Sequence, residues 1–114
     1  MRQNQAMTNP ASLPTVRRRT EQTPALEPRY HLVLLDDNDH SYAYVIELLG
    51  RVLGYSVEKS FALARVVDTQ GRAIIETAAY ERVMDHQRQI HAYGADRRIP
   101  HCKGSMSALV EAAP

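Results

Sequence analysis

The sequence predicts a small α+β domain in which a three-stranded antiparallel sheet carries helices on one face. Short β-branched and aliphatic runs and stretches of helical periodicity follow one another in the order strand, helix, helix, strand, helix, strand. Because strands and helices do not alternate strictly, an antiparallel sheet is favoured over a parallel one. The length of 114 residues is that of one domain.

A change of composition near residue 28 divides the chain. Residues 1–28 contain four of the six prolines, many Gln, Asn, Ser and Thr residues, and few large apolar side chains. Such a segment buries too little surface to offset the entropy lost on ordering, roughly 1–2 kcal/mol per residue for the backbone. We therefore predict a disordered N-terminal arm over residues 1–28 and a folded domain over residues 29–114.

The first strand is predicted from Tyr30 to Leu35, an aliphatic run that stops at the turn-forming residues 36–39. The apolar residues that follow recur at helical spacing and predict a helix ending at Gly54, which readily adopts a left-handed cap. These apolar residues are Val45, Leu48, Leu49, Val52 and Leu53. The candidate N-caps of this helix are Asn38, Asp39 and Ser41.

The second half of the domain is predicted to contain two helices and two strands. One helix begins after Ser56 and closes near residues 69–71, and a strand follows over residues 72–77. Thr77 is predicted to cap a third helix that runs up to Gly94. The last strand is placed over residues 99–106, although the proline and glycine in that stretch disfavour it.

Charge, hydropathy and cysteine content exclude several classes of protein. The 14 Lys and Arg residues nearly balance the 13 Asp and Glu residues, so no overall field attracts nucleic acid or an anionic membrane. The apolar runs are far shorter than the ~20 residues that span a bilayer, and no secretory signal follows Met1. We therefore expect a cytoplasmic location. Cys102 is the only cysteine, which excludes an internal disulfide and a multi-thiolate zinc site.

Acidic residues form the most informative cluster. Those at positions 36, 37 and 39 precede the first helix, where the helix dipole stabilises a carboxylate by roughly 0.3–1 kcal/mol, so ordinary capping alone would account for them. Asp68 instead lies in the last turn of the second helix, where the helix dipole disfavours a negative charge. If this turn packs beside the acidic loop, Asp36, Asp37 and Asp68 meet at the rim of an apolar groove formed by Leu34, Val45, Ala64 and Val67. The alternative is an exposed Asp68 that makes a local turn bond.

Other reactive side chains form weaker patterns. His86 and His91 are five positions apart and point to different sides of a helix, so no metal site is predicted. Cys102 adjoins His101, but neighbours on a strand point to opposite faces and do not share a proton. Neither an enzyme nor a cofactor is therefore predicted. The three arginines at positions 17–19 favour solubility over nucleic-acid binding.

Four stretches taken together resemble the ClpS family, small adaptors that deliver N-degron substrates to a Clp ATPase-protease. The resemblance extends from Tyr30 to about Pro100. It rests on residues 30–39, on Val45-Ile46 with Leu49, on residues 54–60 and on residues 70–73. It implies an α+β sandwich similar to the C-terminal domain of the ribosomal stalk protein, which agrees with the element order read from the residues.

The resemblance implies a site for the free α-amino group of a substrate and for its first side chain, typically Phe, Tyr, Trp or Leu. Where the family has its amine ligands, an Asn, an Asp and a His, this chain has Asp36, Asp37 and Asp68. Two of the family's pocket methionines are replaced by Tyr42 and Ala64. Ala64 enlarges the groove and Tyr42 fills part of that space, and the enlarged, acid-rich pocket leaves room for a basic or polar first residue. The implied side-chain pocket consists of Leu34, Asn38, His40, Tyr42, Val45, Ala64, Val67 and His101.

The resemblance also implies docking onto the N-terminal domain of a Clp AAA+ ATPase. The family's docking surface at the start of the third helix matches at Glu81, and His86 stands in place of a Lys. The expected partners are N-degron peptides or proteins and that ATPase, with no nucleic acid and no membrane. The alternatives are a binding module with altered first-residue specificity and a regulatory module that delivers nothing. A thiol-dependent enzyme or a nucleic-acid-binding arm ranks below both.

Overall fold

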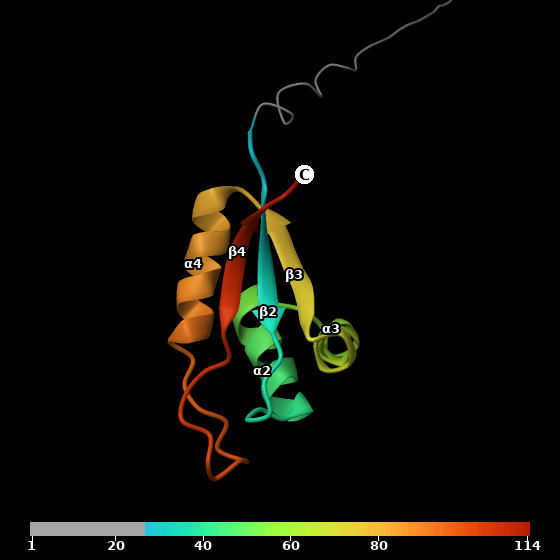
Figure 1. Cartoon of the computed structure of the whole chain (residues 1–114), viewed down its shortest axis with the longest axis vertical. Coiled ribbons are helices and arrows are strands. Elements are labelled where there is room, and N and C mark those ends of the chain that lie inside the picture. The colour runs from blue at the N-terminus through green and yellow to red at the C-terminus, as the bar shows by residue number, and fades with distance from the viewer. Residues whose placement is uncertain (1–26) are drawn as a thin grey trace, which may run out of the picture.

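A computed structural model describes residues 27–114 and contains three helices and three strands (Figure 1). The predicted arm, residues 1–28, falls almost wholly outside the described residues. The predicted α+β class and the element order are confirmed. In chain order the elements are β2 (Tyr30–Leu35), α2 (Tyr42–Leu53), α3 (Val57–Gln70), β3 (Arg72–Ala78), α4 (Tyr80–His91) and β4 (Ala108–Ala112).

The sheet places β2 in the centre, with β3 and β4 antiparallel on either side (Figure 1). Leu32 and Leu34 of β2 are fully buried, as expected for the middle strand of a small sheet. One core cluster joins the strands to all three helices. The helices contribute Leu48 and Leu49 from α2, Ala64 and Val67 from α3, and Val83 and Ile90 from α4.

Local capping signals explain where α2 and α3 begin and end. Of the three candidate N-caps of α2, Ser41 is the one used, and its hydroxyl accepts a hydrogen bond from the Tyr44 N–H at 3.1 Å. Ser56 caps α3 in the same way. Gly54 and Gly71 end the two helices with φ of 73° and 86°, in the left-handed region that favours glycine.

The predicted cap and end of the third helix are wrong. Thr77 does not cap α4. It lies in β3, opposite His31, and its hydroxyl is 2.8 Å from the His31 Nδ1. The strand ladder therefore extends further than predicted, and α4 begins after Ala79, which makes no side-chain cap. The helix also ends at His91 instead of running up to Gly94.

The predicted position of the last strand is also wrong. The strand β4 covers Ala108–Ala112, and residues 99–106 form turns, in line with the missing N–H of Pro100. Side chains of α4 hold the start of β4. The Gln87 amide donates to the Ala108 carbonyl at 2.8 Å, and the Ala108 N–H donates to the His91 Nε2 at 3.1 Å.

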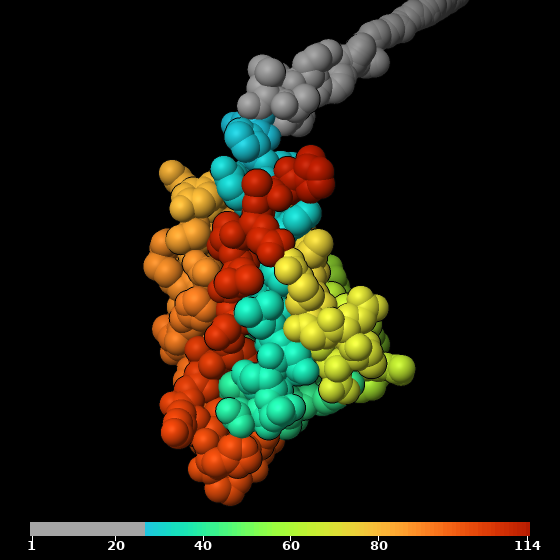
Figure 2. All heavy atoms as spheres, in the orientation of Figure 1, coloured from blue at the N-terminus to red at the C-terminus, as the bar shows by residue number. Residues whose placement is uncertain are grey.

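The segment between α4 and β4 forms one end of the domain, beside the loop that follows β2 (Figure 2). This end carries the pocket described below. None of the helices within residues 27–114 is long and apolar enough to cross a membrane.

Candidate functional site

A cavity of about 210 Å³ opens where the loop after β2 meets α2, α3 and the segment before β4. Three stretches of chain that are distant in sequence therefore contribute to one pocket. We call it the acidic pocket. The residues that line it are Asp36, Asp37, Asn38, His40, Ser41, Tyr42, Val45, Ala64, Val67, Asp68 and Met106.

Backbone hydrogen bonds at the end of β2 place the acidic loop beside the end of α3. The Asp36 N–H donates to the carbonyl of Gly71, the C-cap of α3, at 2.9 Å. The Leu35 N–H donates to the Ser107 carbonyl at 3.0 Å, which adds the segment before β4. The end of β2 is therefore hydrogen-bonded both to the end of α3 and to the segment before β4. As a result, Asp36 and Asp68 line the same cavity.

Three carboxylates line this cavity, those of Asp36, Asp37 and Asp68. The sequence predicted that these acids converge, and the structure brings them together; their role as ligands stays a prediction. Within residues 27–114, no Lys, Arg or His side chain forms an ion pair with Asp36 or Asp68. Unpaired like charges at one site favour the binding of a cation.

His40 links the loop after β2 to the segment before β4. Its ring is buried, with 3% of the side chain exposed, and its Nδ1 lies 2.7 Å from Asp37 Oδ1. Its Nε2 lies 2.7 Å from the Gly104 carbonyl and 3.3 Å from Cys102 Sγ. The Cys102 contact was missed because the sequence suggested only its neighbour His101 as a partner.

Tyr42 explains how Asp68 is tolerated at the end of α3. The Tyr42 hydroxyl donates to Asp68 Oδ2 at 2.8 Å, and its ring packs against Phe61 at 5.5 Å between ring centres. The hydrogen bond to Asp68, together with burial, raises the pKa of Tyr42, so the phenol stays a donor at neutral pH. The carboxylate that the helix dipole disfavours thus gains a donor from α2.

The floor of the pocket is apolar. Val45, Ala64, Val67 and Met106 are all nearly fully buried and line it together. Met106 was not predicted, because it lies in a segment without periodicity and only the packing of that segment brings it to the pocket.

Two residues predicted for the side-chain pocket do not line it. Leu34, on β2, is fully buried in the hydrophobic core. His101 is 69% exposed and pairs instead with Asp39 Oδ1 at 3.0 Å. The family resemblance placed His101 on the last strand, but that strand begins only at Ala108.

The two predicted docking residues lie on different surfaces. Glu81 is exposed in the first turn of α4 and lines a groove of about 460 Å³ together with Glu27, Pro28, Tyr30, Ala79 and Tyr80. His86 is largely buried, and its Nδ1 lies 2.7 Å from Glu76 Oε1 on β3. Glu81 is therefore free to meet a partner, whereas His86 is engaged inside the domain.

No group of three or more His, Cys, Asp and Glu side chains within the described part of the chain is arranged to hold a metal ion. What the pocket offers is hydrogen-bond acceptors and negative charge at its rim and apolar surface at its floor. This combination suits a ligand with a cationic end attached to a less polar body.

The fold and the pocket define a small α+β binding domain. The family model described as "ATP-dependent Clp protease adaptor protein ClpS" matches residues 25–100, which is more than half of the chain. The chain belongs to the ClpS family of Clp protease adaptors.

The fold is also found among solved structures. One of them is described as "The structure of Agrobacterium tumefaciens ClpS2 bound to L-phenylalaninamide" and matches with a TM-score of 0.65 and 15% sequence identity. The match covers 75% of this chain and 98% of that one. No curated protein matches the sequence.

Proposed function

We propose that the acidic pocket binds the free α-amino group and first side chain of an N-degron substrate, and that the chain delivers this substrate to a Clp AAA+ ATPase. Membership of an adaptor family supports the general role. The observation that carries the specific proposal is the convergence of Asp36, Asp37 and Asp68 around a cavity with an apolar floor.

The carboxylates suit an α-ammonium group. The pKa of an α-amino group is ~7.7–8.0, so it is largely cationic at neutral pH. Among the described residues, Asp37 Oδ2 and Asp68 Oδ1 accept no hydrogen bond, and both remain available to a ligand. Each charge-assisted hydrogen bond is worth roughly 1.5–3 kcal/mol.

The floor favours a bulky hydrophobic first side chain. Val45, Ala64, Val67 and Met106 present hydrocarbon and a thioether, and none of them offers a hydrogen bond to a polar group. Agrobacterium ClpS2, which has the same fold, is described as bound to L-phenylalaninamide, an aromatic residue with a free amino group.

A basic or polar first residue is the second candidate. Three carboxylates exceed what one α-ammonium neutralises, and the Tyr42 hydroxyl lies at the same rim. A second cation in the ligand would use this surplus charge.

Acetylation of the substrate's amino terminus is expected to abolish binding. A peptide that begins with Phe should bind at micromolar concentration or better, about −8 kcal/mol. Its acetylated form loses the ammonium charge and should bind at least ~100-fold more weakly, because two charge-assisted hydrogen bonds are lost. Fluorescence anisotropy with the full chain measures both affinities. Equal affinities would contradict amine recognition.

A panel of peptides that differ only in the first residue separates the two candidates. If Phe, Tyr, Trp or Leu binds more tightly than Arg or Lys, the apolar floor sets the specificity. The reverse order would show that the surplus carboxylates set it.

Charge reversal at Glu81 is expected to impair delivery without affecting the pocket. Glu81→Lys should weaken pull-down of a Clp ATPase N-terminal domain by roughly tenfold, because a charge at the rim of an interface is reversed. Asp85→Lys, which is exposed on the same helix, is the matched control. Peptide affinity should be unchanged in both variants. Failure of the unmodified chain to bind the ATPase domain would instead favour a regulatory module.

A further inference from the structure

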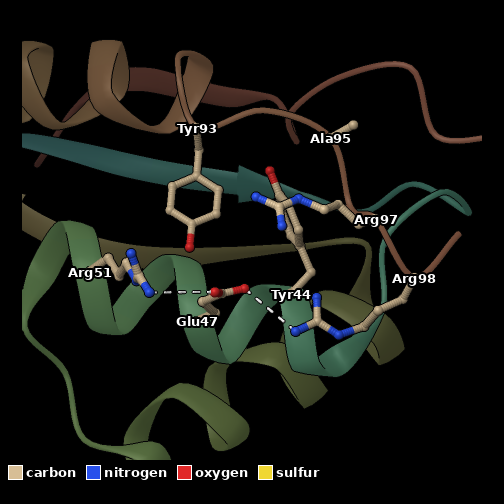
Figure 3. Close-up of a pocket in the computed structure, with 7 residues that line it drawn as sticks. All are labelled: Tyr44, Glu47, Arg51, Tyr93, Ala95, Arg97 and Arg98. Atoms are coloured by element: carbon tan, nitrogen blue, oxygen red, sulfur yellow. Dashed lines mark ion pairs between the residues drawn. The ribbon is translucent and has the colours of Figure 1, made fainter.

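A second cavity has the opposite charge and shares no lining residue with the acidic pocket. Its volume is about 580 Å³, and small-molecule sites typically span ~300–1,000 Å³. Figure 3 shows α2 forming one wall and the segment after α4 forming the other. We call it the arginine pocket. It is lined by Tyr44, Glu47, Arg51, Tyr93, Ala95, Arg97 and Arg98.

The charges in the arginine pocket do not balance. Three guanidinium groups and one carboxylate, that of Glu47, line the cavity, and the buried Asp96 carboxylate contacts Arg98 at 3.1 Å from outside the lining, so one positive charge is in excess. Figure 3 shows Glu47 between Arg51 and Arg98. The N–O distances are 3.8 Å to Arg51 and 3.5 Å to Arg98, longer than a good hydrogen bond. Glu47 therefore leaves guanidinium donors available to a ligand, although Arg98 also donates to Asp96.

Arg97 is the most available of these cations. Within residues 27–114, it forms no ion pair and no side-chain hydrogen bond. In Figure 3 its guanidinium group points from the segment after α4 toward the middle of the cavity. The Tyr93 hydroxyl also points into this space, and burial, with a smaller effect from Glu47, raises its pKa, so it stays a donor at neutral pH.

Hydrogen bonds outside the cavity fix the segment after α4 that forms one wall of the pocket. Asp96, 1% exposed, accepts hydrogen bonds from the Arg98 N–H at 3.0 Å and from Arg98 Nη1 at 3.1 Å. The Tyr44 hydroxyl donates to the Gly94 carbonyl at 2.6 Å, which fixes the start of the same segment. The Arg98 side chain and the start of the segment are therefore in place before a ligand arrives, which lowers the cost of binding.

We propose that the arginine pocket binds a phosphate group, carried by a small ester or free in solution. A phosphate monoester carries about −1.5 to −2 charges and three strong acceptor oxygens at pH 7, so it can meet more than one of the guanidinium groups at once. Planar guanidinium groups bind phosphate oxygens through paired N–H donors. A carboxylate ligand has two acceptor oxygens instead of three and a single charge, so it meets fewer of the guanidinium donors. The proposal does not depend on what the acidic pocket binds.

Titration calorimetry of the full chain at low ionic strength, with glycerol phosphate as the probe, tests this. Arg97→Ala is expected to weaken binding by roughly tenfold, because charge-assisted hydrogen bonds are lost. Glu47→Gln removes the competing carboxylate and is expected to tighten binding by roughly threefold. Arg88→Ala, an exposed arginine of α4 outside the pocket, changes the net charge equally and should leave the affinity unchanged.

Two further probes, inorganic phosphate and acetate, distinguish a free phosphate ion from a phosphate ester and a phosphate from a carboxylate. Inorganic phosphate that binds as tightly as glycerol phosphate assigns the pocket to the free ion, and weaker binding of inorganic phosphate assigns it to the ester. Acetate that binds as tightly as phosphate would overturn the proposal, as would equal losses in Arg97→Ala and Arg88→Ala. Circular dichroism confirms that each variant is folded.

Discussion

Replacing Asp68 by Ala is expected to weaken the binding of a peptide with a free amino terminus by roughly ten- to a hundredfold, the value of one charge-assisted hydrogen bond. Asp68 lines the acidic pocket, and one of its oxygens has no partner among the described residues. The residue is exposed, in the last turn of α3. Its removal therefore acts on the ligand more than on the core. Fluorescence anisotropy at pH 7 with a Phe-first peptide measures the loss.

Asp37 requires a gentler substitution. Its Oδ1 holds the buried ring of His40, so Asp37→Ala would leave a buried polar group without a partner. Asp37→Asn keeps an oxygen acceptor and removes the charge, and should also weaken binding by roughly tenfold or more. Asp85→Asn, an exposed acid of α4, provides a matched control for net charge.

Tyr42 provides the test for an indirect effect of Asp68. Tyr42→Phe removes the hydroxyl that donates to Asp68 and leaves the carboxylate in place. We expect its affinity to fall much less than that of Asp68→Ala, because the carboxylate that would pair with the ammonium group is retained. A loss as large as that of Asp68→Ala would show that Asp68 acts by positioning Tyr42. Full affinity in both Asp68→Ala and Asp37→Asn would show that the amine does not bind in this pocket.

The parts of the fold that local signals determine could be predicted from the sequence. The aliphatic run of β2, the apolar spacing of α2 and the glycines at positions 54 and 71 each act within a few residues, and the structure shows them where expected. The convergence of Asp36, Asp37 and Asp68 was predictable for a related reason. An acid in the last turn of a helix is unfavourable because of the helix dipole, which suggests that it has a role outside the helix. The acids that follow the first strand were the nearest candidates to share that role.

The segment between α4 and β4 could not be predicted, because its path depends on single polar contacts between residues far apart in the chain. Asp96 bonds to Ser41, and His40 bonds to the Gly104 carbonyl. No periodicity marks such contacts in the sequence. Met106 in the acidic pocket and Arg97 and Arg98 in the arginine pocket were missed for this reason, and His101 was placed in a pocket that it does not line.

Asp96 is expected to be the side chain on which this segment most depends. Its carboxylate is buried and accepts hydrogen bonds from the Ser41 N–H at 2.8 Å and from the Ser41 hydroxyl at 2.7 Å, in addition to those from Arg98. Asp96→Ala should lower the free energy of unfolding by about 3 kcal/mol or more, because buried donors lose their acceptor. Urea denaturation at pH 7 measures it. Asp85→Asn, at the surface, should change stability by less than about 0.5 kcal/mol.

The pH dependence of this contribution has a definite sign. Burial acts to raise the pKa of Asp96, but the hydrogen bonds from Ser41 and Arg98 outweigh it and hold the pKa well below its ordinary value of 3.8. The stabilisation is therefore fully present above that value and is lost as the pH falls below it toward the folded-state pKa. The stability difference between the unmodified chain and Asp96→Asn should stay constant from pH 7 to about pH 5 and shrink below about pH 4. A difference that stays unchanged at pH 3 would mean that the charge of Asp96 does not hold Ser41, the N-cap of α2, beside the acidic pocket.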